Sequence, residues 1–181
     1  MEIGCGAGRM TAQLAGVFDR VIALDVSPDQ IRLAQQFLGP QVHNVDFHTV
    51  DDVKIPAPDG SCTGMFSSHV FQHLSEFGSI VRYWEESYRV LAAGGTMCFH
   101  LPIPGAHRNP DVSWVRLTLH NLATRVRRIM GRLKIMEYHR YSPLLILRVL
   151  DQIGFRDVEL RVFNMRSNGD AHSFFFARRP D

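Results

Sequence analysis

Apolar residues follow two alternating patterns along this chain. Short runs rich in valine, isoleucine, phenylalanine and methionine have the length and composition of buried strands. Between several of these runs, apolar residues recur every three or four positions, as on one face of a helix. The runs predict strands at residues 1–3, 20–25, 45–50, 64–68, 96–101, 158–163 and 173–177, and the periodic segments predict helices at residues 9–17, 28–38, 76–91, 113–136 and 143–153.

Two of these helices carry clear signals at their ends. Ser27 is a good N-cap, Pro28 suits the first helical position, and the Gln30 side chain can complete a capping box with the serine. The glycine pair 94–95 predicts the end of the helix at residues 76–91. The apolar face of that helix is predicted to consist of Ile80, Trp84, Tyr88 and Leu91.

The order of these elements indicates the fold class. Strands that alternate with helices are typical of an α/β domain, in which helices cover both faces of a parallel sheet. The last two strands follow each other closely and predict an antiparallel pair. We therefore expect one domain over residues 1–181 with a seven-stranded, mostly parallel, Rossmann-like sheet. The length of 181 residues is sufficient for a sizeable core.

Composition and cysteine spacing indicate an ordinary globular protein in a reducing compartment. With 45% hydrophobic and 21% charged residues and a net charge of +2, the composition is that of an ordinary globular protein. Cys5, Cys62 and Cys98 show no zinc-site spacing and no disulfide framework, so we expect no metal and a reducing compartment, the cytoplasm. No transmembrane run or signal peptide is visible.

A glycine-rich turn between the first predicted strand and helix is the main candidate for ligand binding. Gly4, Gly6 and Gly8 alternate with other residues, which lets the backbone come close to a ligand. A dinucleotide-binding fingerprint would require a third glycine at Arg9 or Thr11, so the spacing disfavours that ligand. No Walker phosphate-binding loop is present either.

With its acid and apolar residue, the turn reads E-I-G-C-G-A-G over residues 2–8. In this motif the chain resembles the class I S-adenosylmethionine-dependent methyltransferases, especially their small-molecule branch with methyltransferase type 11/25-like domains. The resemblance extends over nearly the whole chain, including residues 67–74 after the fourth strand. It implies that S-adenosylmethionine is the cofactor and that a small molecule accepts the methyl group.

The resemblance also implies roles for individual residues. Asp25, at the end of the second strand, would hold the ribose hydroxyls, and Val26 would lie against the adenine. Asp51 would meet the adenine amino group, and Asp52 would offer a backbone contact. The full set of cofactor-binding residues implied in this way is Glu2, Gly4, Cys5, Gly6, Gly8, Asp25, Val26, Asp51, Asp52 and Ser68.

Two features depart from the family pattern. Many members have an acid at the position of Thr63. The first strand of the family also begins several residues before its acid, whereas only Met1 precedes Glu2 here. Because each lost buried apolar residue would cost about 1.5–3 kcal/mol, we expect the domain to be truncated at its first strand.

Several acceptor classes are disfavoured by residues near the predicted site. Residues 68–71 lack the motif of amino-methylating nucleic-acid enzymes, a Pro-Cys nucleophile for cytosine is missing, and the glutamate pair 85–86 does not resemble that of arginine methyltransferases. We therefore expect no nucleic-acid partner. His69 is the candidate catalytic base. For His73, His100 and His139 we expect packing or surface roles.

The segment 113–136 carries six positive residues and no acid around an apolar stripe. Within an insertion at residues 103–140, it predicts a lid-like helix with a solvated basic side, or else a contact with a membrane surface or an acidic, lipid-linked substrate. Three functions stay open: a small-molecule methyltransferase, a non-catalytic cofactor-binding or scaffold protein with the same fold, and a methyltransferase acting at a membrane surface.

Overall fold

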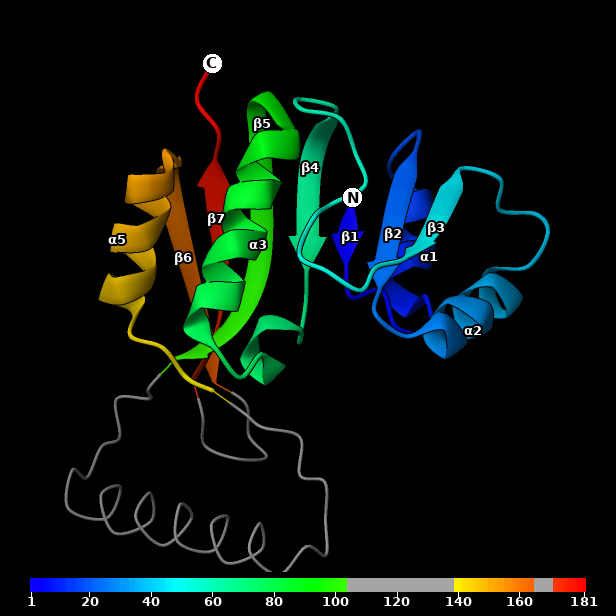
Figure 1. The fold of residues 1–181 in the computed structure, drawn as a ribbon, viewed down its shortest axis with the longest axis horizontal. Coiled ribbons are helices and arrows are strands. Elements are labelled where there is room, and N and C mark those ends of the chain that lie inside the picture. Colours follow the sequence, from blue (N-terminus) through cyan, green and yellow to red (C-terminus); the bar gives the residue numbers. More distant parts are fainter. Residues whose placement is uncertain (104–138, 165–170) are drawn as a thin grey trace, which may run out of the picture.

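The computed structural model describes residues 1–103, 139–164 and 171–181. The described strands form one seven-stranded sheet in the order β3-β2-β1-β4-β5-β7-β6 (Figure 1). The elements are β1 (Glu2–Ile3), α1 (Arg9–Ala15), β2 (Val21–Asp25), α2 (Pro28–Leu38), β3 (Val45–Thr49), β4 (Cys62–Ser67), η1 (Phe71–His73), α3 (Phe77–Val90), β5 (Leu91–Ile103), α5 (Pro143–Ile153), β6 (Arg156–Asn164) and β7 (Ala171–Arg178).

The sheet is mostly parallel, as predicted. β1 pairs in parallel with both β2 and β4, and β2–β3 and β4–β5 are parallel too. β7 pairs antiparallel with both β5 and β6, which confirms the predicted antiparallel pair at the end of the chain. In Figure 1, α3 and α5 lie in front of the sheet and α1 lies behind β2, so helices flank it on both faces.

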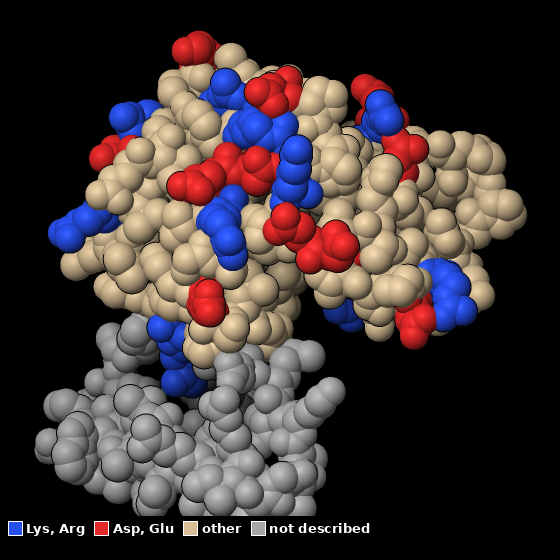
Figure 2. Space-filling model, in the orientation of Figure 1, with Lys and Arg blue, Asp and Glu red and all other residues tan. Residues whose placement is uncertain are grey.

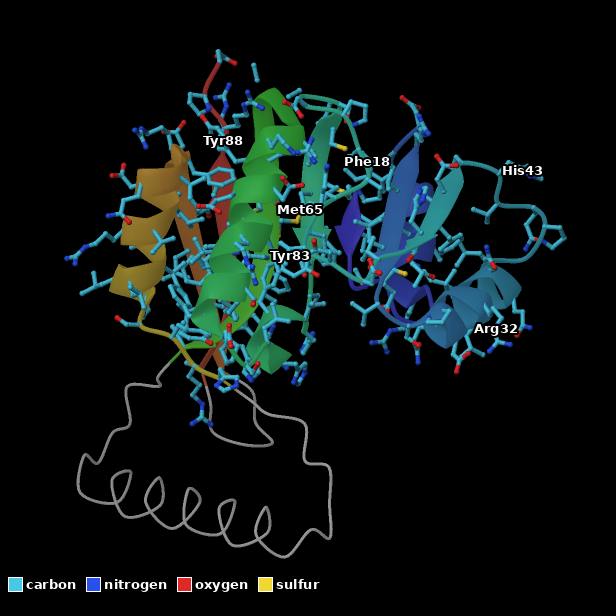
Figure 3. All side chains as sticks on the ribbon, in the orientation of Figure 1. Phe18, Arg32, His43, Met65, Tyr83 and Tyr88 are labelled. Carbon is cyan, nitrogen blue, oxygen red and sulfur yellow. The ribbon has the colours of Figure 1, made fainter. Side chains whose placement is uncertain are left out.

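Aromatic side chains fill the core between α3 and the sheet. Trp84 of α3 is fully buried, and its ring lies 4.9 Å from that of Phe99 on β5. Phe99 stacks in turn on Phe175 of β7, with ring centroids 5.1 Å apart. Met65 of β4 and Tyr83 of α3, both labelled in Figure 3, belong to the same buried cluster. Burial of this kind is the main source of stability for such a sheet–helix layer.

The glycine pair 94–95 does not end the helix predicted at residues 76–91, although the helix stops within one residue of the predicted end. α3 ends at Val90, and β5 begins at Leu91, so the glycine pair 94–95 lies within the strand. The guanidinium of Arg179 donates hydrogen bonds to the carbonyls of Tyr88, Arg89 and Leu91, and a cation there satisfies the open end of the helix. The buried face of α3 consists of Ile80, Tyr83, Trp84, Ser87 and Val90, with Tyr88 only half-buried.

The N-terminus of α2 also differs from the predicted capping box. The Ser27 hydroxyl accepts a hydrogen bond from the Gln30 backbone N–H at 3.3 Å, as predicted. The Ser27 backbone N–H, however, donates to Asp25 Oδ1 at 2.9 Å rather than to the Gln30 side chain. A carboxylate forms the stronger bond to an N–H, so Asp25 takes the second half of the box.

Residues 104–138 and 165–170 lie outside the described residues. The predicted basic helix at 113–136, with its lid and membrane-contact interpretations, therefore falls outside the described part of the chain. Among the described helices, none combines the length and the apolar character needed to cross a membrane.

Gly8 offers a test of the packing between the glycine turn and α2. Its φ is +85°, and a Cβ built there would lie 2.9 Å from Ala34 Cβ and 2.8 Å from Leu38 Cδ1. Gly8→Ala is expected to lower the free energy of unfolding by about 1–2 kcal/mol for backbone strain and by a further ~1–3 kcal/mol for overpacking. Urea denaturation measures the loss.

The matched control is Gly60→Ala, because Gly60 has a φ of +63° but no heavy atom within 4 Å of the added Cβ. This variant should show the strain cost alone. Equal losses in the two variants would contradict the close packing of Gly8 against α2.

Candidate functional site

The predicted cofactor-binding residues gather at the carboxyl ends of β1 and β2. Both Gly4 and Cys5 donate their backbone N–H to the carbonyl of Leu24, at 2.8 and 2.9 Å. These bonds fold the glycine turn over the end of β2. The register of β1 against β2 places Ile3 opposite Leu24, so the turn starts directly beside Asp25.

The Asp25 carboxylate joins the glycine turn to the start of α2. Its Oδ2 accepts the Gly6 N–H at 2.8 Å, and its Oδ1 accepts the Ser27 N–H at 2.9 Å. Each carboxylate oxygen has a second lone pair that these bonds leave free. Asp25 can therefore accept two further hydrogen bonds from hydroxyl groups of a ligand.

Gly6 differs from the other two glycines of the turn in the space around it. A Cβ at Gly4 would lie 2.1 Å from Val70 Cγ2, so this glycine makes room for a side chain of the protein. At Gly6 the nearest atom would be Gln30 Oε1 at 3.9 Å, and the φ of +52° also favours glycine. The open space that was predicted at both Gly4 and Gly6 is thus found at Gly6, beside the Asp25 carboxylate.

Glu2 lies beneath the turn and is buried, with an exposed fraction of 3%. The Thr11 hydroxyl donates to Glu2 Oε2 at 2.6 Å, which ties β1 to α1. Burial raises the pKa of the Glu2 carboxyl, and the nearby Asp25 carboxylate adds to this effect, while the Thr11 bond opposes it. In this structure the carboxylate supports the turn from within.

Cys5 is also buried, in a small cluster with Ala23 and Ile31. Burial raises the pKa of its thiol to about 12, and the carboxylates of Asp25 and Glu2 contribute to the shift. Since its side chain faces the interior, a ligand over the turn could meet only the backbone of Cys5.

The segment that follows β3 comes close to Asp25. The Val50 N–H donates to the Asp25 carbonyl at 3.0 Å, which brings the next two residues, Asp51 and Asp52, to the same edge of the sheet. Both are exposed, as is Val26, with an exposed fraction of 69%. The Asp52 carboxylate accepts the Val53 N–H at 2.6 Å, whereas the Asp51 side chain forms no hydrogen bond with any residue that the structure describes.

Arg89 of α3 holds the far end of this segment. It donates to the carbonyls of Ile55 and Ala57 and to the carboxylates of Asp59 and Glu86. Its guanidinium lowers the pKa of the Glu86 carboxyl. On the face seen in Figure 2, acidic and basic side chains are interspersed over the described residues, so the charge there does not gather into a patch of one sign.

The segment after β4 packs against the glycine turn. Ser67 donates its hydroxyl to the Ile3 carbonyl at 3.1 Å, and the Val70 side chain fills the space beside Gly4. Between them, Ser68 Oγ and His69 Nδ1 lie 2.8 Å apart. His69 has a φ of +61°, which is uncommon for a residue with a side chain, and its ring is exposed.

Sequence reasoning missed His172. His172 Nδ1 lies 2.9 Å from His100 Nε2, and the His69 ring stacks on the His100 ring with centroids 4.3 Å apart. Burial, reinforced by the two neighbouring histidines, lowers the pKa of His100 to about 3. Partial desolvation, with the nearby His172, His73 and Arg9, also lowers the pKa of His69, although the residue stays largely exposed. These two imidazoles are therefore neutral at pH 7.

His73 and His139, for which packing or surface roles were predicted, make contacts within the segment that follows β4 and with Tyr141. Gln72 Nε2 and His73 Nε2 are 3.0 Å apart. The His139 N–H donates to the Gln72 carbonyl at 2.8 Å, and its ring stacks on Tyr141.

A groove of about 380 Å³ lies elsewhere, on the outer face of α3 and α5. It is lined by Val81, Glu85, Tyr88, Val149, Gln152 and Ile153. None of these residues is at the carboxyl edge of the sheet, so this groove is separate from the candidate site around Gly6 and Asp25.

Comparison with known proteins gives a consistent picture. A family model described as a methyltransferase domain matches residues 1–99. The chain is similar to ajmaline N-methyltransferase from Rauvolfia serpentina, with 29% identity over 134 residues, 72% of this chain and 43% of that protein. It is also similar to malonyl-[acyl-carrier protein] O-methyltransferase from Erwinia billingiae (strain Eb661), with 24% identity over 173 residues, 95% of this chain. The chain spans 64% of the latter relative and less of the former.

Solved structures share the fold at low sequence identity. A methyltransferase from Methanosarcina mazei has a TM-score of 0.75 at 17% identity, over 99% of this chain and 91% of that one. Phosphoethanolamine N-methyltransferase 2 from Haemonchus contortus, in complex with S-adenosyl-L-methionine, has a TM-score of 0.72 at 16% identity, over 99% of this chain and 48% of that one.

The reactivity of the cysteines tests whether the Cys5 side chain is buried beneath the glycine turn. The pKa of Cys5 is raised to about 12 and that of Cys98 to about 11, in both cases mainly by burial. Cys62 is buried, and all three thiols are free. At pH 8, Cys5 and Cys98 of the native protein are expected to react with a disulfide reagent at least about a hundredfold more slowly than an ordinary thiol, because the thiolate is the reactive form.

Adding guanidinium chloride should expose the three thiols and restore ordinary rates. The release of the coloured product, followed by absorbance, gives both rates. Rapid modification of Cys5 in the native protein, mapped by mass spectrometry, would contradict its burial beneath the turn.

Proposed function

Because this chain belongs to the methyltransferase domain family, we propose that it transfers a methyl group from S-adenosylmethionine to a small-molecule acceptor. S-adenosylmethionine supplies an electrophilic methyl group when it is bound, and S-adenosylhomocysteine is the second product. The observation that carries the proposal is the Asp25 carboxylate beside the open side of Gly6.

The residues around Asp25 fit the chemical groups of this cofactor. The free lone pairs of the Asp25 carboxylate would accept the ribose hydroxyls. The open space at Gly6 would admit the amino-acid end of the cofactor over the turn. Asp51, exposed and next in the chain after Val50, would accept a hydrogen bond from the adenine amino group, while Val26 offers an exposed apolar surface for the ring.

The remaining predicted residues would act mainly by supporting this arrangement. The Glu2 carboxylate holds α1 beneath the turn through Thr11, and Gly8 allows α2 to pack closely against it. Cys5 would contribute its backbone. Ser68 lies in the loop after β4, whose Val70 packs against Gly4 of the turn. Positioning of the two reactants can supply much of the rate enhancement in such a displacement.

A base is needed only for acceptors that must lose a proton early. His69 remains the predicted candidate: Ser68 engages its Nδ1, so Nε2 is the nitrogen available to an acceptor. The two relatives reported above are an N-methyltransferase and an O-methyltransferase, which supports a nitrogen or oxygen acceptor without choosing between them. We also propose a cytoplasmic location, supported by the three free thiols.

Replacement of Asp25 tests the proposal. Calorimetry should detect binding of S-adenosylmethionine to the wild-type chain. Asp25→Ala is expected to weaken this binding by about 1.5–3 kcal/mol, the range for hydrogen bonds to a charged group, or about 10- to 150-fold. Formation of S-adenosylhomocysteine with a panel of small nitrogen and oxygen nucleophiles tests turnover.

Asp46→Ala is the matched control, because Asp46 lies on the neighbouring β3 and its carboxylate pairs with Arg20 at 2.7 Å. It should bind the cofactor as the wild type does. Equal affinity of the Asp25 variant and the wild type would remove Asp25 from the site, and binding without turnover on any acceptor would favour a non-catalytic cofactor-binding protein.

A further inference from the structure

Three histidines from distant parts of the sequence meet at one edge of the sheet. His69 follows β4, His100 lies near the end of β5, and His172 lies at the start of β7. One ring nitrogen from each histidine can be chosen so that the three lie within 4.8 Å of one another. His100 and His172 are buried, while His69 is exposed.

The topology of the sheet explains this meeting. β5 and β7 are antiparallel, and their register sets Pro102 opposite His172, so the end of one strand adjoins the start of the other. β4 and β5 are parallel, with Ser67 opposite Phe99, so the loop after β4 leaves the sheet beside His100.

Backbone conformation completes the cluster. With a φ of +61°, His69 adopts the left-handed region, which is strained for a residue other than glycine. The His69 ring stacks on the His100 ring in this conformation. Strain that is maintained where three imidazoles meet is a reason to look for a ligand.

We propose that His69, His100 and His172 bind one divalent transition-metal ion, with Zn²⁺ as the best match. Imidazole nitrogen suits zinc, copper, iron and nickel, whereas Mg²⁺ and Ca²⁺ prefer oxygen. Among the described residues, the cluster holds three nitrogen ligands and no carboxylate. Three protein ligands leave a fourth position of a tetrahedral ion open, as in catalytic zinc sites.

To hold zinc, the rings would have to turn as well as shift, because an imidazole binds a metal in its own plane and the His69 ring is stacked on the His100 ring with centroids 4.3 Å apart. Zinc–nitrogen bonds of about 2.0–2.1 Å set tetrahedral ligand atoms about 3.3 Å apart. His100 Nε2 and His172 Nδ1, at 2.9 Å, would have to separate slightly. Since the widest separation in the cluster is up to 4.8 Å, His69 would have to move closer. Its exposed side chain can turn toward the other two without disturbing the core.

The position of the cluster suggests a purpose. Val70, the neighbour of His69, packs against Gly4 of the glycine turn, so the ion would lie close to the proposed cofactor site. There it would bind an acceptor oxygen and lower the pKa of its hydroxyl, whose proton would pass to solvent. This consequence rests on the proposed function, whereas metal binding itself does not. A metal site here would overturn the expectation of no metal that the cysteine spacing gave, and a ligand role for His69 would replace its predicted role as a base.

Metal binding is tested on the full chain without a histidine tag, after treatment with a chelator. Calorimetric titration with Zn²⁺ should give one equivalent bound. His69→Asn is expected to weaken the affinity at least about tenfold, because one of three imidazoles is lost. Asparagine tolerates the left-handed conformation, so this variant keeps the loop and leaves the two buried histidines in place.

His43→Asn is the matched control. His43 is exposed and precedes β3, at the side of the molecule away from α5 (Figure 3), and its replacement should leave Zn²⁺ binding unchanged. Failure of the wild type to bind Zn²⁺, or equal binding by the His69 variant, would overturn the proposal and leave the cluster as a packing contact.

X-ray absorption of the zinc-loaded wild type provides evidence that does not depend on a variant. A first shell with three imidazole nitrogens is the expected result, and a sulfur ligand would overturn the assignment. The two proposals are separated by the reciprocal measurements. Asp25→Ala should retain Zn²⁺ binding, and His69→Asn should retain the affinity for S-adenosylmethionine, whatever the outcome for the other site.

Discussion

The parallel pairing of β1 with both β2 and β4 is the constraint on which the candidate site depends. β1 is only two residues long, but its register fixes the ends of both neighbours: Ile3 lies opposite Leu24 on one side and Ser67 on the other. From β1 the chain continues to β2 and β3 on one side of the sheet, and β4 and β5 occupy the other. The crevice where the order of strands reverses is the place where open α/β sheets bind ligands.

Asp25 converts this arrangement of strands into a chemical site. It is the last residue of β2, and its carboxylate accepts hydrogen bonds from the N–H groups of Gly6, in the glycine turn, and Ser27, the N-cap of α2. Its own carbonyl accepts the Val50 N–H from a third segment. One residue thus connects the glycine turn, the N-terminus of α2 and the segment containing Asp51. A change at Asp25 acts on the geometry of all three as well as on a bound ligand.

Sequence patterns predicted the features that depend on local chemistry. The strand–turn–helix order around Gly4, Gly6 and Gly8, the start of α2 at Pro28 and the antiparallel pair at the end of the chain are all confirmed. The errors concern long-range partners. The end of α3 is set by Arg179, about 90 residues away, and the second half of the predicted capping box is taken by Asp25. No local signal near Leu91 or Gln30 reports such contacts.

The same limit applies within the candidate site. The motif and the order of strands predicted that Gly6, Asp25 and Asp51 would come together, because the carboxyl ends of parallel strands share an edge. They could not show that Val70 occupies the space beside Gly4, which leaves only Gly6 open. Nor could they indicate His172, whose contact with His100 spans 72 positions and depends on the register of β5 with β7.

Because β7 is antiparallel, the residues at its start, including His172, lie at the same edge of the sheet as the carboxyl ends of the parallel strands. A parallel strand brings its carboxyl end to the edge, whereas an antiparallel strand brings its first residues there. In the proposed function, the parallel half of the sheet, through Gly6 and Asp25, would hold the methyl donor. The start of β7 adds His172 to His69 and His100 in the other half of the sheet, next to the loop that contacts the turn. Donor and acceptor chemistry would then come from different halves of one sheet, so that either set of side chains could change while the other is kept.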